Sequence, residues 1–182
     1  MSDIYTNNII DKDDNVLHGK VNLVFPIKNI TQGTAFTTLQ AANDDVLTLD
    51  NDVISIKDDV SVYGNLGNVA FTKTNSIEIT GNALAALSFT NLTANAPGKT
   101  ITFINPATVS GNFTLTAGKI TPSASFTLNG SVATILGIAN FINGAVTINN
   151  VGSDVLIPVG KNNRAAYVEL TGASGTASSF TV

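Results

Sequence analysis

Residues 111–135 read GNFTLTAGKITPSASFTLNGSVATI, and this stretch decides the fold class. Apolar and small polar residues alternate in it with a period of two, and Gly, Asn or Pro interrupts the alternation at short intervals. Such a period places successive side chains on opposite faces of a β-strand. The stretch therefore predicts short β-strands joined by tight turns.

The alternation continues along most of the chain. Runs at Val46–Leu49, Val53–Ile56 and Val60–Tyr63 are separated by turns rich in Asp or Asn. Later strand candidates recur about every 8 to 15 residues, at Ile77–Thr80, Leu87–Leu92, Thr100–Ile104, Asn112–Thr116, Ser125–Leu128, Val132–Leu136, Ala145–Ile148, Val155–Val159, Ala166–Leu170 and Ser179–Val182. Val21–Ile27 predicts a strand that stops near Pro26, and a short helix is expected only within Thr31–Ala42.

Short strands at this spacing are typical of all-β proteins. We expect either a β-sandwich or jelly-roll-like fold or an irregular β-solenoid. A strict repeat would have a fixed period, whereas the glycines of the runs are unevenly spaced, at Gly64, Gly81, Gly111, Gly130 and Gly144. Strand edges with few charges favour oligomers, so we also expect a homotrimer in which each chain supplies strands to a shared axis.

The composition argues against catalysis. From Ser61 to Val182 the chain has no Cys, Trp or His, and its acids are Glu78, Asp154 and Glu169. Enzymes and metal sites need clusters of groups that titrate, attack or ligate. We expect no enzymatic activity and no cofactor. The chain has neither the basic stripe of a nucleic-acid binder nor the roughly 20 apolar residues of a membrane span, and no secretory signal is visible.

Charge divides the chain unevenly. The net charge is −4, yet residues 1–60 hold ten acids and four lysines, a balance of −6. The remaining residues hold five bases and three acids. We predict an acidic N-terminal anchoring segment at 1–50, a Thr/Asn/Gly-rich β region at 51–140 and a C-terminal β module at 141–182.

Some N-terminal polar residues match known ligand patterns. Asp11, Asp13 and Asn15 have the spacing that begins a calcium loop. Val16 and Asn22 stand where that loop needs Gly and Glu, so a solvated turn is the better interpretation. His18 is the only imidazole, and no G-x-S-x-G motif supplies a nucleophile for it. We interpret it as a surface residue.

Other motifs also have structural interpretations. The pairs Asp50/Asp52 and Asp58/Asp59 could ligate a cation or act as acid and base, but no Trp is present and Tyr63 is the only Tyr near them. Protection of a strand edge by charge explains them better. Gly172–Gly175 predicts tight turns rather than a phosphate loop. Glycosylation sequons begin at Asn29, Asn91 and Asn112, a motif common by chance in such a chain.

The C-terminal residues carry a resemblance. Residues 141–182, FINGAVTINNVGSDVLIPVGKNNRAAYVELTGASGTASSFTV, resemble a β module of large flavobacterial surface proteins, through Ile157-Pro158-Val159-Gly160 and the closing Phe180-Thr181-Val182. Residues 111–135 are similar to the Thr/Gly/Asn-rich repeats that often precede that module. The resemblance implies that Ser179–Val182 closes the module begun at Phe141. Members of that family are secreted and much longer than this chain.

Together these features predict a structural protein. The whole chain resembles a phage spike, fibre or capsid-decoration protein, which implies a virion location, contacts with other capsid or virion proteins and attachment to a glycan or protein of the host surface. A bacterial cell-surface adhesin or filament subunit, extracellular in location, is the alternative. A carbohydrate-active β-helix protein comes third, because the carboxylates that such an enzyme needs are missing.

Overall fold

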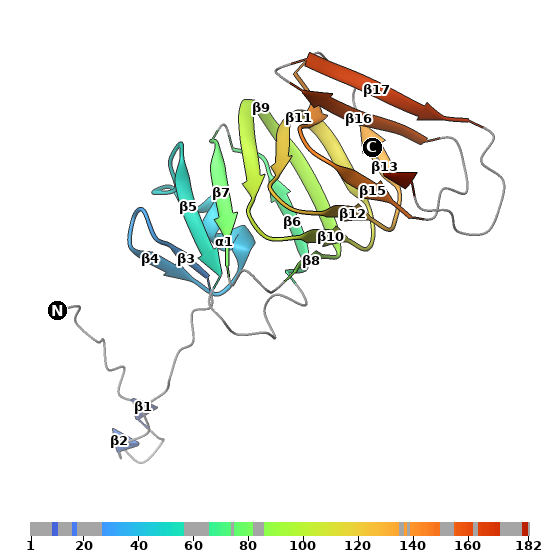
Figure 1. Cartoon of the computed structure of the whole chain (residues 1–182). Coiled ribbons are helices and arrows are strands. Elements are labelled where there is room, and N and C mark those ends of the chain that lie inside the picture. Colours follow the sequence, from blue (N-terminus) through green and yellow to red (C-terminus); the bar gives the residue numbers. More distant parts are fainter. Residues whose placement is uncertain are drawn as a thin grey trace.

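The computed structural model describes residues 9–10, 16–17, 27–56, 66–73, 75–81, 86–134, 137, 139–149, 155–161, 164–171 and 180–181. The regular elements of the described part are strands, apart from one short helix, which confirms the all-β prediction (Figure 1). Its elements are β1 (Ile9–Ile10), β2 (Val16–Leu17), β3 (Ile27–Asn29), β4 (Thr34–Phe36), α1 (Leu39–Asp44), β5 (Asp52–Ile56), β6 (Asn68–Phe71), β7 (Ile77–Thr80), β8 (Leu87–Phe89), β9 (Asn91–Phe103), β10 (Ala107–Val109), β11 (Phe113–Pro122), β12 (Phe126–Leu128), β13 (Val132–Thr134), β14 (Phe141–Ile142), β15 (Val146–Ile148), β16 (Val155–Lys161), β17 (Arg164–Leu170) and β18 (Phe180–Thr181).

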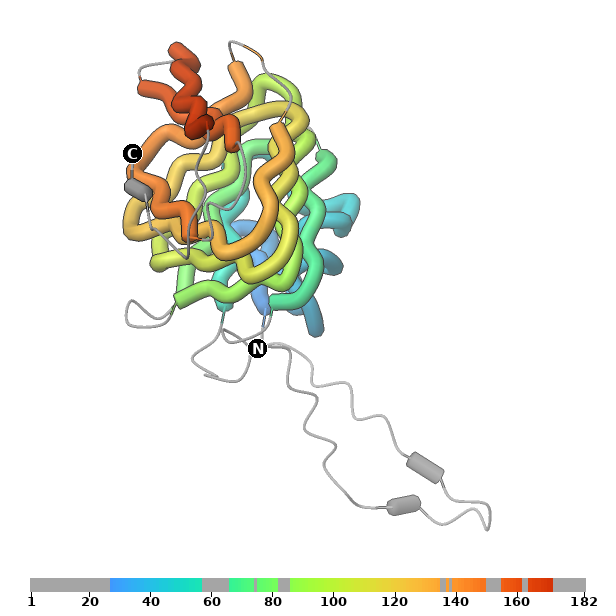
Figure 2. The backbone as a smooth tube through the Cα atoms, turned by 90° about the vertical axis from the view of Figure 1, so that its right-hand side faces the viewer, coloured from blue at the N-terminus to red at the C-terminus, as the bar shows by residue number. Residues whose placement is uncertain are grey.

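The strands are stacked as the coils of a β-solenoid. Each coil passes through three faces, and strands on a face pair in parallel with the equivalent strands of neighbouring coils. Face 1 holds β8, β10, β12 and β15. Face 2 holds β6, β13 and the first parts of β9 and β11. Face 3 holds β5, β7, β14, β16 and the second parts of β9 and β11. Figure 2 shows these coils one behind another.

The register shows how regular the stack is. On face 1 the aligned positions are Leu87, Ala107, Phe126 and Val146. One coil therefore takes 19 or 20 residues along this face, a period that uneven glycine spacing concealed. The reason is that the glycines are not equivalent. Gly111 and Gly130 lie at the corner between faces 1 and 2, whereas Gly144 lies against Pro122 at a different corner.

The core lies inside the coils. Alternate residues of each strand point inward, which gives a buried column of Ile77, Ile101, Ile120, Ile142 and Val159 on face 3. Buried phenylalanines from all three faces also fill the interior. The ring centroid of Phe103 lies 5.5 Å from that of Phe89 and 6.0 Å from that of Phe126. Apolar burial of this kind is the main favourable term in folding.

Antiparallel strands cover both ends of the stack. At the end we call the head, β3 pairs with β5 and β4, and α1 packs beside β3, β4 and β6. At the opposite end, the tail, β17 pairs antiparallel with β16 and β18 pairs antiparallel with β15. An uncovered coil would present unpaired N–H and C=O groups to other chains. The reversed strands limit that exposure.

Several predicted elements differ from the observed ones. Val46–Leu49 is not a strand, so that prediction is wrong. The segment is an irregular loop in which the polar residue Thr48 is buried and its apolar neighbours are exposed. The helix begins at Leu39, inside the predicted range, and ends at Asp44, after it. Strands β1, β2, β4, β6, β10 and β14 were not predicted, and β4 lies within Thr31–Ala42, where a helix was expected. Val60–Tyr63 and most of Val21–Ile27 lie outside the described residues, and Ile27, where the second of these strands was expected to stop, begins β3 instead.

β18 is a strand of the C-terminal residues, as expected, and it pairs with β15. The buried core is continuous from Ile27 to Val159. The three-part division of the chain and the homotrimer stay predictions.

Candidate functional site

The carboxylates of Asp50 and Asp52, which the sequence favours as charges that protect a strand edge, are both engaged by other residues of the fold. Asp52 is 2% exposed at the start of β5, where its carboxylate accepts hydrogen bonds from Asn29 Nδ2 (2.8 Å), the Leu49 N–H (2.9 Å) and Gln32 Nε2 (3.1 Å). Burial alone would raise the pKa of Asp52, but these three hydrogen bonds and the charge of Lys73 outweigh it and lower the pKa. The group stays ionised and fully engaged.

Asp50 has a different role. Its carboxylate pairs with Lys99 and accepts a hydrogen bond from the Ser76 N–H at 2.6 Å. The hydrogen bond from Lys99, followed by that from Ser76, lowers the pKa of Asp50. Because Ser76 and Lys99 belong to successive coils, Asp50 connects the head to them. Neither aspartate is available as a proton donor at neutral pH.

Most of the other candidate residues lie outside the described residues. They are Asp11, Asp13, Asn15, His18, Asn22, Asp58, Asp59, Tyr63 and Gly172–Gly175. Of Val16, the structure describes only its place in strand β2. Within the described part of the chain, no three His, Cys, Asp or Glu residues are grouped as metal ligands. No helix there is long and apolar enough to cross a membrane.

The sequon asparagines Asn29, Asn91 and Asn112 have structural roles. Asn29 is completely buried, and its Oδ1 accepts from the N–H groups of Thr31 and Gln32, both at 3.1 Å. Asn91 and Asn112 belong to the asparagine ladder, a column of equivalent corner residues made by Asn68, Asn91, Asn112 and Ser131. Attachment of a sugar at these positions would break hydrogen bonds that hold the coils.

The asparagine ladder joins coils at the corner between faces 1 and 2. Asn91 Nδ2 donates to Asn68 Oδ1 at 2.8 Å, and Asn91 Oδ1 accepts from the Asn112 N–H at 2.7 Å. Ser131 Oγ donates to Asn112 Oδ1 at 2.5 Å. A similar contact joins Asn149 Nδ2 to Asn129 Oδ1 at 2.8 Å. Neutral hydrogen bonds, rather than charges, therefore fasten this surface.

Charge is confined to part of the surface. The strands and corner residues of faces 1 and 2 contain no Asp, Glu, Lys or Arg in the described chain, and present Ser, Thr, Asn and Ala outward. On face 3, Glu78, Lys119 and Lys161 lie on strands. Depletion of charge is common at the centre of protein interfaces. The neutral faces are therefore contact surfaces to consider, and no sequence motif singled them out.

A second feature that sequence reasoning missed is an exposed apolar loop at the head. Val46 is 82% exposed, and Leu47 and Leu49 are each 55% exposed. The period-two alternation of these residues with Thr48 predicts a strand, which the structure does not have here. Their neighbours in space, which decide the direction of each side chain, come from residues 27–32 and 73–76.

Neither family models, nor curated proteins, nor solved structures gave a match to this chain.

Proposed function

We propose that the chain is a non-enzymatic structural protein of a virion, a spike, fibre or capsid-decoration subunit that contacts other virion proteins and attaches to a host surface. The observation that carries this proposal is the way the solenoid uses its polar side chains. Amides and hydroxyls join one coil to the next. Of the two aspartates of the head, Asp52 accepts a hydrogen bond from Asn29 and Asp50 pairs with Lys99, so both also serve to hold the fold. Such a molecule is a rigid spacer with outward faces.

The neutral faces support the attachment part of the proposal. They expose hydroxyls, amides and small apolar groups, which can hydrogen-bond to and pack against a neutral glycan or a second copy, without charged groups that contact would desolvate. On this proposal the chain works as a homotrimer, and part of the neutral surface is covered by neighbouring copies. Residues 1–16, with their acidic cluster, supply the attachment to the particle.

The experiment is to locate the protein. Purified particles would be analysed by mass spectrometry, and antibody labelling would be imaged by electron microscopy. We expect the protein in the particle at a stoichiometry that is a multiple of three. Its recovery in the cell envelope without particles would instead favour a bacterial adhesin or filament subunit.

A deletion tests the division of labour. Removal of residues 1–16 should leave a folded oligomer that no longer joins the particle. Circular dichroism and light scattering check folding and assembly, and sedimentation with particles checks attachment. Normal incorporation of the truncated protein would contradict the anchoring role.

A further inference from the structure

The chain contains two Asn-Gly pairs, Asn129-Gly130 and Asn143-Gly144. In such a pair the glycine nitrogen, which no Cβ atom shields, can attack the asparagine Cγ atom. A bond from this nitrogen to Cγ forms and closes a cyclic imide. The Cγ–Nδ2 bond breaks, and Nδ2 leaves as ammonia with the proton that the glycine nitrogen gave up. Water then opens the imide at either carbonyl carbon, which gives aspartate or isoaspartate. Asparagine is for such reasons a thermolabile residue.

The Asn143-Gly144 pair is open to this reaction. Asn143 follows β14, and its N–H donates to the Ile120 oxygen at 2.8 Å. Its side chain makes no hydrogen bond within the part of the chain that the structure describes. Gly144 is exposed, and its N–H has no hydrogen-bond partner among the same residues. The amide can therefore turn toward a nitrogen that is free to give its proton to solvent.

The Asn129-Gly130 pair is held in place. Asn129 Oδ1 accepts a hydrogen bond from Asn149 Nδ2 at 2.8 Å. Gly130 is half-buried and packs so closely that a Cβ atom there would lie 2.0 Å from the Gly111 oxygen. For Cγ to approach the glycine nitrogen, this hydrogen bond would have to break and the corner between the coils would have to open. The same dipeptide thus has two environments in one chain, and Asn129 is an internal reference for Asn143.

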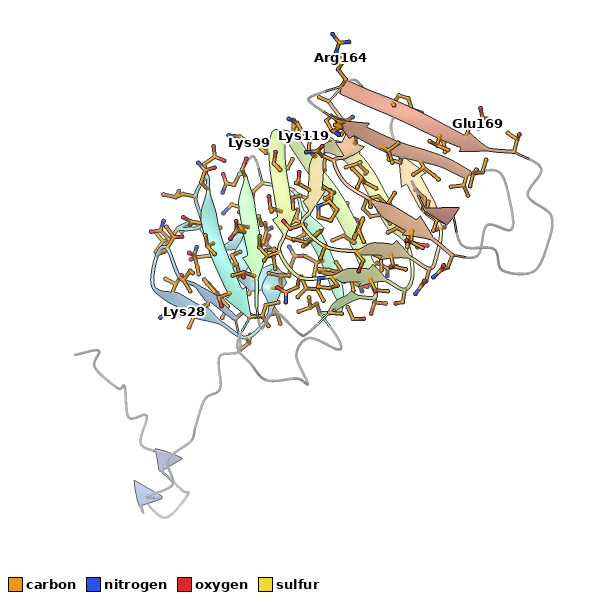
Figure 3. All side chains as sticks on the ribbon, in the orientation of Figure 1. Lys28, Lys99, Lys119, Arg164 and Glu169 are labelled. Atoms are coloured by element: carbon orange, nitrogen blue, oxygen red, sulfur yellow. The ribbon has the colours of Figure 1, made fainter. Side chains whose placement is uncertain are left out.

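The charge around Asn143 also favours the reaction. Asn143 follows the buried residue Ile142, so the alternation of the strand points its side chain outward, beside Thr121 of β11. Lys119 lies on the same side of β11, and its Nζ is 5.7 Å from the ring centroid of Phe141. Figure 3 shows Lys119 at the upper edge of the stack. A positive charge on this face stabilises the negative charge that develops while the imide forms.

We propose that Asn143 is a site of spontaneous deamidation, at which the folded chain acquires aspartate or isoaspartate while Asn129 stays an amide. The conversion places a carboxylate on the neutral corner between β14 and β15, which joins face 3 to face 1 in the last parallel coil. Nothing in this step depends on the proposed function, because the reactants are the chain itself and water.

Isoaspartate has a further effect on the fold. Its main chain runs through Cβ and Cγ, so the corner becomes longer by one atom. Gly144 has little room to absorb that length, because a Cβ atom there would already lie 3.0 Å from Pro122 Cγ. We therefore expect the isoaspartate form to hold β15 less firmly against β12.

The first test follows both sites in one sample of the folded, full chain. The protein is incubated at mildly alkaline pH, and tandem mass spectrometry locates the mass gained when an amide becomes an acid. We expect Asn143 to convert at least about tenfold faster than Asn129, because Asn129 must first lose its hydrogen bond and its packing. Equal rates, or a faster rate at Asn129, would overturn the proposal.

The chain unfolded in urea is the control for sequence effects. Both asparagines precede glycine, so we expect similar rates there, and a contrast that appears only on folding. A contrast that persists in urea would come from the local sequence and would overturn the role given to the fold. So would a folded chain in which Asn143 stays intact while the unfolded chain converts.

A matched pair of variants tests the same assignment without locating the mass. Ageing of the chain should produce an acidic species on ion exchange, and the earliest one should be absent from N143Q and retained in N129Q. Glutamine keeps the amide, but its longer side chain does not close the same imide. Circular dichroism checks that both variants fold. Persistence of the earliest acidic species in N143Q would overturn the proposal.

N143D separates the charge from the longer main chain, because it has the carboxylate on an ordinary backbone. We expect it to melt close to the unmodified chain. The isoaspartate fraction, purified from aged protein, should melt about 2–4 °C or more below N143D. Equal melting of the two would overturn the inference that isoaspartate loosens the last coil.

Discussion

At the scale of single residues, amide side chains make hydrogen bonds to backbone groups that a neighbouring strand would otherwise make. Gln40 of α1 accepts from the Ala70 N–H at 2.6 Å and donates to the Ala70 oxygen at 3.1 Å. It pairs with β6 as a strand would. Asn140 likewise accepts from the Gly118 N–H and donates to the Thr116 oxygen. Buried backbone groups need such partners. This explains why a chain with 12% charged residues is so rich in Asn and Thr.

Asp52 makes the stability of the head depend on pH. A carboxylate with a lowered pKa in the folded chain contributes stability above its unfolded pKa of about 3.9 and loses it as the pH falls through the lowered value. Asp52 is such a group. We expect urea unfolding to show a loss of stability below about pH 4. D52N should be about 1–3 kcal/mol less stable at pH 7 and should lose less on acidification. An identical pH profile for D52N would contradict this role.

Gly130 is needed for the close approach of two coils. A Cβ atom there would lie 2.0 Å from the Gly111 oxygen, a distance that no rotamer change relieves. Gly33 offers the control: it has a φ of 78°, and a Cβ there meets nothing within 4 Å. G33A should cost about 1–2 kcal/mol through backbone strain, and G130A should cost more through overlap. Thermal melting compares them. A smaller loss for G130A would show that the corner can open.

At the scale of elements, Phe103 is the centre of the core. Its ring lies near those of Phe71, Phe89 and Phe126, which come from three other strands. Truncation of a buried Phe to Ala costs about 3–5 kcal/mol. F103A should therefore lower the free energy of unfolding by about this amount, whereas I104S at the next position should change it by less than about 0.5 kcal/mol. Denaturant unfolding measures both. Equal losses would place Phe103 outside the core.

Elements with strong alternation were predictable, and elements defined by their neighbours were not. Ile77–Thr80 was predicted with its observed bounds because its apolar residues alternate and Gly81 follows. Leu87–Leu92 was predicted as one strand, but the chain turns a corner at Thr90 and divides it between β8 and β9. Conversely, β9 and β11 each continue through a corner. The local sequence pattern predicts that a segment is a strand, but it does not predict the residue at which the chain turns from one face of the coil to the next.

The candidate sites show the same limit. Asp50 and Asp52 were identified as a charged pair from their spacing, yet their functions depend on Asn29, Ser76 and Lys99, which are far away in the sequence. The loop between α1 and β5 was predicted as a strand because its apolar and polar residues alternate with a period of two. Only the partners of Thr48 reveal that the apolar residues face outward.

At the scale of the whole molecule, the stack behaves as a series of similar units. Each coil contacts mainly the coils before and after it, as the parallel register between neighbouring strands shows. In such proteins, stability is approximately a sum of terms for each repeat and for each contact between neighbours. A whole coil should therefore be removable, provided that the remaining coils meet in register.

The register identifies which residues to remove. Phe126 occupies in its coil the position of Ala107 in the preceding one, and Val132 that of Phe113. Deletion of residues 107–125 joins Pro106 to Phe126 and brings β12 beside β8 and β13 beside the first part of β9. We expect this variant to keep a β-sheet circular dichroism spectrum and a cooperative thermal transition, at a lower melting temperature. The control is deletion of residues 107–126, which shifts the following strand by one residue. A shift of one turns inward side chains outward, so the control should unfold at a clearly lower temperature or aggregate. Equal melting of the two deletions would mean that register between coils does not hold the stack together.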